Sequence, residues 1–404
     1  MKVLVLDEHF SNKYAKNGAF GRNGFIRVIT RILILHEGSL SKFQLHIPNM
    51  VLDSFQEVDQ WMKLLARKGV RELNIANLNQ RYQLPSYIFS CQKLRKLKLD
   101  NCIFKPPLQF EGFLDLEELE LKNIVFGKNL NGTQISLPGL KNLYLNSCTD
   151  VYNFNIKAEK LEILYLGLCA DATLLLRLLD SQCLTCLTTL IVDRIIFNNL
   201  TKDLKPAKKV NFATMFSHLP RITTLVIDSH ILKFLIADNI PRLLPHAINS
   251  LSHLCLLSFH SDLNQLHGAL CLLRNSPNLE RLCMLHAGFM KEHEVVPALD
   301  QMPTPTCLDF TLNQLRIVGI ECLEGSMIEL FFIKLLLAHS PSLEMLYIIT
   351  SETSNPQKRY NLAKDIMRFP RASPKAQVIC LDPEPKKSSD WLSFLLVMLK
   401  IVWC

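Results

Sequence analysis

The chain is poor in glycine and has no long apolar run, and each of these features excludes a class of protein. Only 14 of the 404 residues are glycine, while 49% are hydrophobic and 20% are charged. This composition excludes collagen-like and disordered chains. No stretch reaches the roughly 18 apolar residues that cross a bilayer. We therefore expect a folded chain with a large core and no membrane span.

The 13 cysteines show no regular pairing, and the first residues do not read as a signal peptide. Residues 1–10 turn acidic before an apolar core can develop. Both features favour a reducing setting without disulfides, so we expect a cytoplasmic or nuclear location, or both. The glycosylation sequons at Asn131 and Asn199 would matter only in the secretory pathway.

Signatures of catalysis and of cofactor binding are missing as well. The chain has no G-x-G-x-x-G, no P-loop, no G-x-S-x-G and no H-E-x-x-H. Cys183 and Cys186 form a lone C-x-x-C, without the second pair that zinc needs or the context of a redox motif. His286, His293 and Glu294 have no base or nucleophile at a defined spacing. We expect no catalytic, metal or cofactor site, and a protein that is not an enzyme.

The net charge of +8 comes from 45 basic and 37 acidic residues spread along the chain. This spread disfavours nucleic acid as a partner. The one local concentration is a lysine-rich loop at 201–209, which contains Lys202, Lys205, Lys208 and Lys209. Such a loop suits a phosphate group on a ligand or on a modified substrate. A solvated insertion explains it too, and is the favoured interpretation.

A leucine pattern, L-x-x-L-x-L with conservative apolar substitutions, recurs along the chain at intervals of 21 to 35 residues. The twelve copies begin at Leu40, Val70, Leu94, Leu116, Leu140, Leu161, Leu187, Ile222, Leu251, Leu279, Leu312 and Leu343. This period is typical of leucine-rich repeats, in which each copy adds one short strand to a parallel sheet. The predicted fold is an α/β leucine-rich-repeat solenoid, with a curved parallel sheet on the concave side and helices and loops on the convex side.

Residues flanking the leucines support this prediction. Proline stands two residues before the first position at Pro138, Pro220, Pro277 and Pro341, which indicates a repeated turn. Cysteine stands eight residues after it at Cys102, Cys148 and Cys169, where leucine-rich repeats prefer Asn or Cys. Between the first two copies, Ser54 as N-cap, Glu57 and Gly69 predict a helix that presents Val58, Trp61, Met62 and Leu65 to the core.

The two ends of the array carry the most specific pattern. LAHSPSLEML at 337–346 and DIMRFPRASPKA at 365–376 resemble the FBD module that closes plant F-box/FBD/LRR-repeat proteins. Residues 6–8 and 21–48 resemble the stretch that follows the F-box in that family. The apolar side chains expected on one helical face there are Phe25, Val28, Ile29, Ile32 and Leu33. The resemblance covers roughly residues 4–382.

This resemblance implies the substrate-recognition part of an SCF-type E3 ubiquitin ligase, whose F-box docks on the Skp adaptor. Only six residues precede Asp7, so we expect the F-box to be absent from this chain and the Skp adaptor to bind only if the gene product has one. The alternative is an F-box-less scaffold or an inactive decoy. The expected organisation is a helical segment at 1–39, the repeat array at 40–350, the FBD module at 351–382 and a poorly ordered apolar tail at 383–404.

Because side chains alternate along a strand, the residues between the leucines should face a partner on the concave side. These outward pairs run Glu72, Asn74; Lys96, Lys98; Glu118, Glu120; Asn142, Tyr144; Ile163, Tyr165; Thr189, Ile191; Thr224, Val226; His253, Cys255; Arg281, Cys283; Gln314, Arg316; Met345, Tyr347. Lys96 and Lys98 should lie beside Glu118 and Glu120 and neutralise them. We predict a protein substrate at an aromatic and aliphatic patch of Tyr144, Ile163, Tyr165 and Ile191. Tyrosines on strands are also simply good β-formers.

Overall fold

A computed structural model describes residues 2–15, 18–49, 56–127, 134–169, 175, 177–178, 184–193, 216–228, 232, 244, 247–259, 263–286, 310–351 and 355–382. The chain divides into two compact units, Met1–Lys209 and Val210–Cys404. The expected tail at 383–404 and the lysine-rich loop at 201–209 lie outside the described residues.

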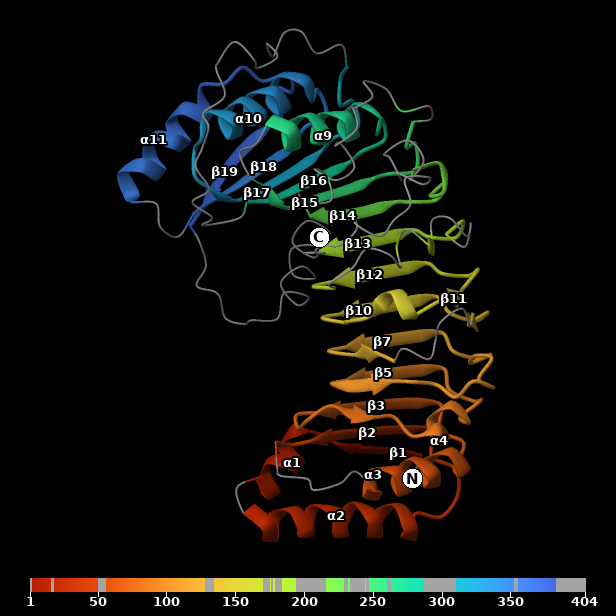
Figure 1. The fold of residues 1–404 in the computed structure, drawn as a ribbon. Coiled ribbons are helices and arrows are strands. Elements are labelled where there is room, and N and C mark those ends of the chain that lie inside the picture. Colours follow the sequence, from red (N-terminus) through yellow and green to blue (C-terminus); the bar gives the residue numbers. More distant parts are fainter. Residues whose placement is uncertain are drawn as a thin grey trace. The chain divides into compact units, whose positions relative to one another are not determined.

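The first unit contains a parallel sheet whose strands follow one another in chain order (Figure 1). Its strands are β1 (Val3–Leu6), β2 (Lys42–Ile47), β3 (Glu72–Asn77), β5 (Lys96–Asp100), β7 (Glu118–Lys122), β10 (Asn142–Asn146), β12 (Ile163–Gly167) and β13 (Thr189–Asp193). Each strand pairs in parallel with the strand of the next repeat, as stacked repeats require.

The second unit repeats this arrangement. Its parallel strands are β14 (Thr224–Asp228), β15 (His253–Phe259), β16 (Arg281–His286), β17 (Ile317–Leu323), β18 (Met345–Thr350) and β19 (Gln377–Leu381). The predicted leucine-rich-repeat fold, α/β with a parallel sheet, is confirmed.

The described helices fall in both units. The first unit has α1 (Glu8–Ala15), α2 (Gly18–Leu35), α3 (Gln56–Arg67) and α4 (Ser86–Phe89), and the second has α9 (Leu263–Arg274), α10 (Met327–His339) and α11 (Pro356–Met367). In the first unit the connections also carry β4 (Tyr82–Gln83), β6 (Cys102–Phe104), β8 (Val125–Phe126), β9 (Ile135–Ser136), β11 (Ile156–Lys157) and the 3-10 helix η2 (Val151–Asn153). None of the described helices is long and apolar enough to cross a bilayer.

The leucines of the repeat form the core, because they occupy the same register on neighbouring strands. Leu97 pairs with Leu119, which pairs with Leu143, and all three side chains are buried. The strands from β5 to β10 alternate buried and half-buried positions for most of their length. Each buried leucine contributes roughly 1.5–3 kcal/mol of hydrophobic stabilisation, so the stacked triplets hold the repeats together.

One copy of the pattern was placed in the wrong register. The copy predicted at Leu312 begins at Leu315, because Arg281 of β16 pairs with Ile317 and Met284 pairs with Ile320. The outward positions of this strand are therefore Ile317 and Gly319, rather than Gln314 and Arg316. Leu312 is buried, but it begins the turn that leads into the strand.

Among the strands that pair side by side with the leucine strands, two were not predicted. β1 lies within the segment 1–39 that we expected to be helical, and it adds a strand before the first leucine copy. β19 lies within the proposed FBD segment and continues the parallel sheet beyond β18. The rest of the first segment forms α1 and α2, and Phe25, Ile29 and Leu33 on one face of α2 are buried as predicted.

The four repeated prolines share one structural role. Leu140, Ile222, Leu279 and Leu343 each donate their backbone N–H to the carbonyl three residues earlier. Each proline is therefore the second residue of a hydrogen-bonded four-residue turn, a position that suits its fixed φ. The predicted turn before the strand is confirmed.

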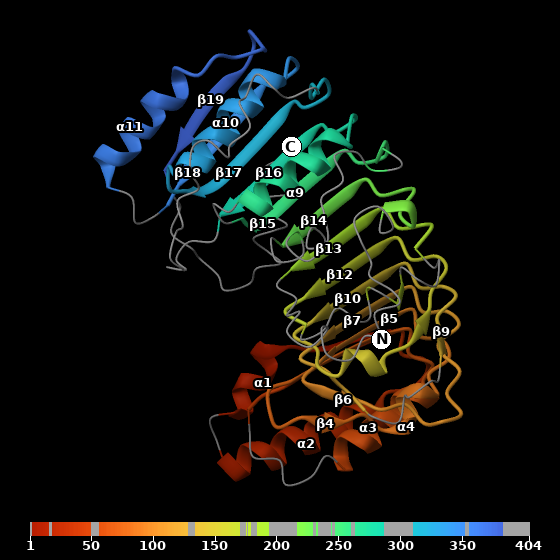
Figure 2. The ribbon, with the colours of Figure 1, turned by 45° about the horizontal axis from the view of Figure 1, so that its top comes forward.

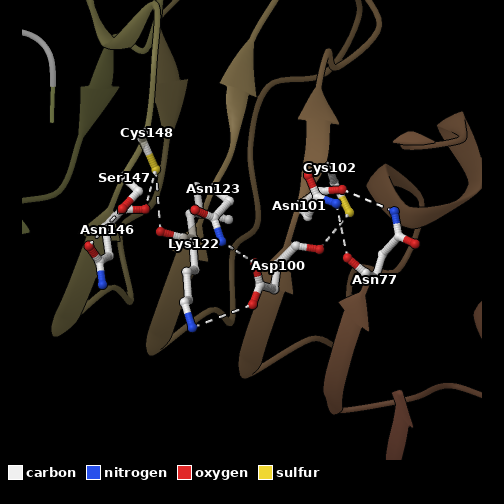
Figure 3. A network of polar contacts seen from close by, with 10 residues as sticks. Asn77, Asp100, Asn101, Cys102, Lys122, Asn123, Asn146, Ser147 and Cys148 are labelled. Atoms are coloured by element: carbon white, nitrogen blue, oxygen red, sulfur yellow. Dashed lines mark hydrogen bonds and ion pairs between the residues drawn. The ribbon is translucent and has the colours of Figure 1, made fainter. Parts of the chain in front are cut away.

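In the first unit, a row of hydrogen bonds, which we call the ladder, joins the carboxyl ends of successive strands (Figure 3). Asn101, Asn123, Ser147 and Leu168 have φ between 50° and 59°, each at the seventh residue after the first leucine. Their N–H groups donate to the carbonyl of the last residue of the next strand, at 2.9 Å in every case. Asn101 also donates from its side chain to the carbonyls of Asn77 and Asn79, at 3.0 and 2.6 Å. The ladder joins each repeat to the next.

The cysteines at the predicted turn position are buried and bonded to the backbone. Cys102 Sγ lies 3.4 Å from the carbonyl of Asp100, Cys148 Sγ 3.3 Å from that of Leu121 and Cys169 Sγ 3.3 Å from that of Gly167. Burial, with a smaller effect from the charge of Asp100, raises the pKa of the Cys102 thiol to about 12. All three thiols thus contact the backbone, as predicted for this turn position, and a neutral thiol is a poor nucleophile and metal ligand.

Candidate protein-binding surface

The candidate surface is the outward face of the strands of the first unit, which we call the strand face. It contains the residues that alternate with the buried leucines on β2 to β13. Its first part is charged. Lys96 Nζ lies 3.2 Å from Glu118 Oε2, and Lys98 Nζ lies 2.8 Å from Glu118 Oε1 and 2.7 Å from Glu120 Oε2. The predicted neutralisation of these four residues is confirmed.

Further ion pairs extend this charged part and were not predicted. Lys42 pairs with Glu72 at 3.7 Å, and Lys122 pairs with Asp100 at 3.7 Å. Arg95 and Glu117, at the entry to β5 and β7, pair at 2.9 Å. The register of the leucines was sufficient to find these pairs, because each joins equivalent positions of neighbouring repeats. At these exposures each pair contributes at most about 1 kcal/mol.

The electrostatics of Lys98 and Glu118 follow from this geometry. Burial by itself would lower the pKa of Lys98, but its hydrogen bonds to Glu118 and Glu120 raise it. Burial would likewise raise the pKa of Glu118, but the hydrogen bonds and charges of Lys98 and Lys96 hold it below its ordinary value. Both side chains therefore stay charged near neutral pH and are compensated by each other.

Tyr144 lies at the border between the charged and the apolar parts of the strand face. It pairs in register with Glu120 on one side and with Tyr165 on the other. Burial raises the pKa of Tyr144, the charge of Glu118 raises it further, Lys98 opposes this, and Glu120 adds to it. The hydroxyl therefore stays protonated, and the half-buried ring offers both an apolar face and a hydrogen-bond donor.

The apolar patch is smaller than the sequence indicated. Tyr144 and Ile163 are half-buried and accessible, whereas Tyr165 and Ile191 are only 5% and 7% exposed. The ring of Tyr165 lies over Gly167 of its own strand, where an added Cβ would come within 2.6 Å of the ring atom Cζ. Its centroid is 6.5 Å from that of Tyr144. Tyr165 thus lies beside Tyr144 on the neighbouring strand, and exposure is found for two of the four predicted side chains.

Other candidate sites gain no support. Lys202, Lys205, Lys208 and Lys209 lie outside the described residues, as do Cys183, His293 and Glu294. In the part of the chain that the structure describes, no group of three or more His, Cys, Asp and Glu side chains lies close enough together to hold a metal ion.

The stacked parallel strands, the leucine core and the closing ladder define a leucine-rich-repeat protein. Residues 58–284, more than half of the chain, match the family model of the LRR repeats of FBD-associated F-box protein At5g56370. The chain therefore belongs to the plant F-box/FBD/LRR-repeat family.

Two relatives from Arabidopsis thaliana extend the similarity along most of the chain. The F-box/FBD/LRR-repeat protein At1g13570 is 29% identical over 365 residues, which are 88% of this chain and 83% of the relative. The F-box/FBD/LRR-repeat protein At5g56420 is 21% identical over 389 residues, which are 88% of this chain and 85% of the relative. The similarity thus reaches well beyond the repeats matched by the family model.

Proposed function

We propose that this chain is a protein-interaction module that captures a protein substrate on the strand face, as the substrate-recognition part of an SCF-type E3 ubiquitin ligase. Its function in this proposal is binding rather than catalysis, in the cytoplasm, the nucleus or both. The family supports the connection to a ligase, and so does the term F-box in the names of the relatives. In this proposal the FBD module is the segment 351–382, which follows the repeats at 40–350.

The single observation that carries the binding site is the position of Tyr144 and Ile163. They are the accessible apolar side chains at the border of a charged strand face whose ions are already paired. Binding hot spots are enriched in tyrosine, and surrounding groups contribute mainly by excluding water. A partner that covers Tyr144 and Ile163 need not separate the Lys98, Glu118 and Glu120 cluster, so it avoids the cost of an unpaired buried charge.

Replacing both Tyr144 and Ile163 by alanine tests this site. We expect the capture of partner proteins from plant extract to fall about thirtyfold, because a hot spot contributes about 2 kcal/mol. Quantitative mass spectrometry of the retained proteins measures the loss. Tyr152→Ala is the matched control, since Tyr152 is 45% exposed and lies on η2, outside the strand face. Equal capture by the double variant and the wild type, with both folded, would remove the site.

A pull-down with the Skp adaptor separates the proposed receptor from a stand-alone scaffold or decoy. The receptor requires that the full gene product retain the adaptor together with a partner of the strand face. A gene product that captures the partner and leaves the adaptor unbound would be a scaffold without ligase coupling.

A further inference from the structure

Among the described strands of the second unit, β19 has one edge that pairs with no other strand. β19 pairs with β18 alone in the part of the chain that is described. Gln377 donates its N–H to the carbonyl of Glu344, so Gln377, Ile379 and Leu381 face β18 with their backbone groups. The N–H and C=O groups of Val378 and Cys380 therefore point away from the sheet. Such an edge is a template for a further strand.

The core beneath this edge is also incomplete. Leu346 and Ile348 of β18 are 0% and 1% exposed, whereas their register partners on β19 are half-buried Val378 and exposed Cys380. α11 lies beside β19 (Figure 2). A small hollow of about 60 Å³ lies between the two elements. Its apolar walls are Ile348, Leu362, Ala363, Ile366 and Leu381. An apolar side chain of one additional strand would reach this hollow.

Two polar atoms at the hollow have no hydrogen-bond partner among the described residues. Thr350 is 7% exposed, and its Oγ1 makes no hydrogen bond to any described residue; the same holds for Arg359 Nε. Among the described residues, Arg359 forms one ion pair, from its Nη1 to Asp382 Oδ1 at 3.4 Å, and the side chain of Asp382 is 94% exposed. A buried hydroxyl and a buried guanidinium N–H left unpaired each cost free energy that a ligand oxygen would recover.

The charge around this edge is one-sided. Residues 355–382 contain six basic and two acidic residues, a net charge of +4 in a chain of net charge +8. The basic residues are Lys358, Arg359, Lys364, Arg368, Arg371 and Lys375. Apart from Arg359, none of them has an ion pair with a described residue. Lys375 is exposed two residues before β19, and Arg359 lies at the other end of the strand beside Leu381 and Asp382.

We propose that β19 is a docking edge for an acidic, extended segment of another protein, whose apolar residues alternate with carboxylates. The segment adds one strand to the sheet by pairing with Val378 and Cys380. Its apolar side chains enter the hollow against α11, and its carboxylates lie near Lys375 and Arg359. This surface is separate from the strand face. The proposal for β19 therefore does not depend on whether Tyr144 and Ile163 bind a substrate.

Fluorescence anisotropy with a short fluorescein-labelled peptide of alternating glutamate and valine tests the proposal on the full chain. We expect saturable binding that weakens as salt is raised, since the attraction is between exposed charges. The matched peptide of alternating lysine and valine should not bind. Equal binding of both peptides would overturn the proposal.

Cys380→Pro removes one N–H from the unpaired edge without touching the bonds to β18, and proline is tolerated at such positions. We expect the acidic peptide to bind at least about tenfold more weakly, whereas Cys380→Ala, which keeps the N–H, should bind like the wild type. Lys375→Glu is a surface change that should also weaken binding and reduce its salt dependence, while Lys141→Glu in the first unit should not.

Two further results would overturn the proposal. One is wild-type affinity of folded Cys380→Pro and Lys375→Glu variants for the acidic peptide. The other is concentration-dependent self-association in light scattering that Cys380→Pro abolishes, because a second copy of this chain would then be the occupant of the edge.

Discussion

Replacing Phe104 by alanine is expected to lower the free energy of unfolding by about 3–5 kcal/mol, the usual cost of emptying a phenylalanine site in a core. Phe104 is 1% exposed and lies on β6, in the connection between β5 and β7 of the first unit. Its ring centroid is 5.3 Å from that of Phe89, 5.8 Å from Phe126 and 5.9 Å from Phe154. These rings belong to successive repeats, so the change removes contacts between repeats as well as within one.

Denaturant unfolding followed by circular dichroism measures this loss. Leu108→Ala is the control, because Leu108 lies in the same connection but is 72% exposed, and it should change stability by less than about 0.5 kcal/mol. A Phe104→Ala variant that unfolds at the wild-type denaturant concentration would show that the rings do not join the repeats.

Replacing Asn101 by alanine is expected to cost about 3 kcal/mol. Asn101 has a φ of 59°, and a left-handed backbone costs an ordinary residue about 1–2 kcal/mol. Its side chain also donates to the carbonyls of Asn77 and Asn79, and each of these hydrogen bonds contributes about 1 kcal/mol. The change therefore removes both the conformational preference and the link to the preceding repeat.

Asn101→Gly separates the two contributions in the same unfolding experiment. Glycine adopts the left-handed conformation freely but donates no side-chain hydrogen bond. We expect it to lose about 1 kcal/mol less than alanine does. If the two variants lost equal stability, the left-handed conformation would have no part in the role of Asn101.

The parallel strands could be predicted because regularly spaced leucines indicate which positions of each strand are buried. Eleven of the twelve copies fall in the observed register. For each of these eleven, the alternation of side chains and the spacing of the leucines together allow one register. The error at Leu312 has a specific cause. Leu312, Leu315 and Ile317 satisfy the L-x-x-L-x-L pattern as well as Leu315, Val318 and Ile320 do, because an apolar residue also begins the turn three residues before the strand pattern. Leu137 and Leu219 occupy the same turn position in other repeats.

β19 was missed because its sequence lacks the full leucine triplet, whereas β1 was missed although Met1, Leu4 and Leu6 fit the pattern. At the positions of the three leucines β19 has Lys375, Val378 and Cys380. Such a strand is recognised by its pairing with β18, which sequence alone does not give. The end strand of a stack buries its core side chains less than an inner strand does, so the pressure for leucine there is weaker.

The charged part of the strand face could be predicted, and the extent of the apolar part could not. Lys96, Lys98, Glu118 and Glu120 are brought together by register, which the leucines define. The burial of Tyr165 depends on its ring lying over Gly167, a packing choice within one strand. Strand alternation assigns a side chain to a face but does not say what covers it there.

Site-specific photo-crosslinking at Ile163 tests the central claim, that the strand face binds a protein partner, most directly. A photoreactive amino acid at position 163 should crosslink a discrete set of proteins in plant extract, and the same residue at position 152 should not. Crosslinks formed from position 152 alone, or equally from both positions, would contradict a partner site on the strand face.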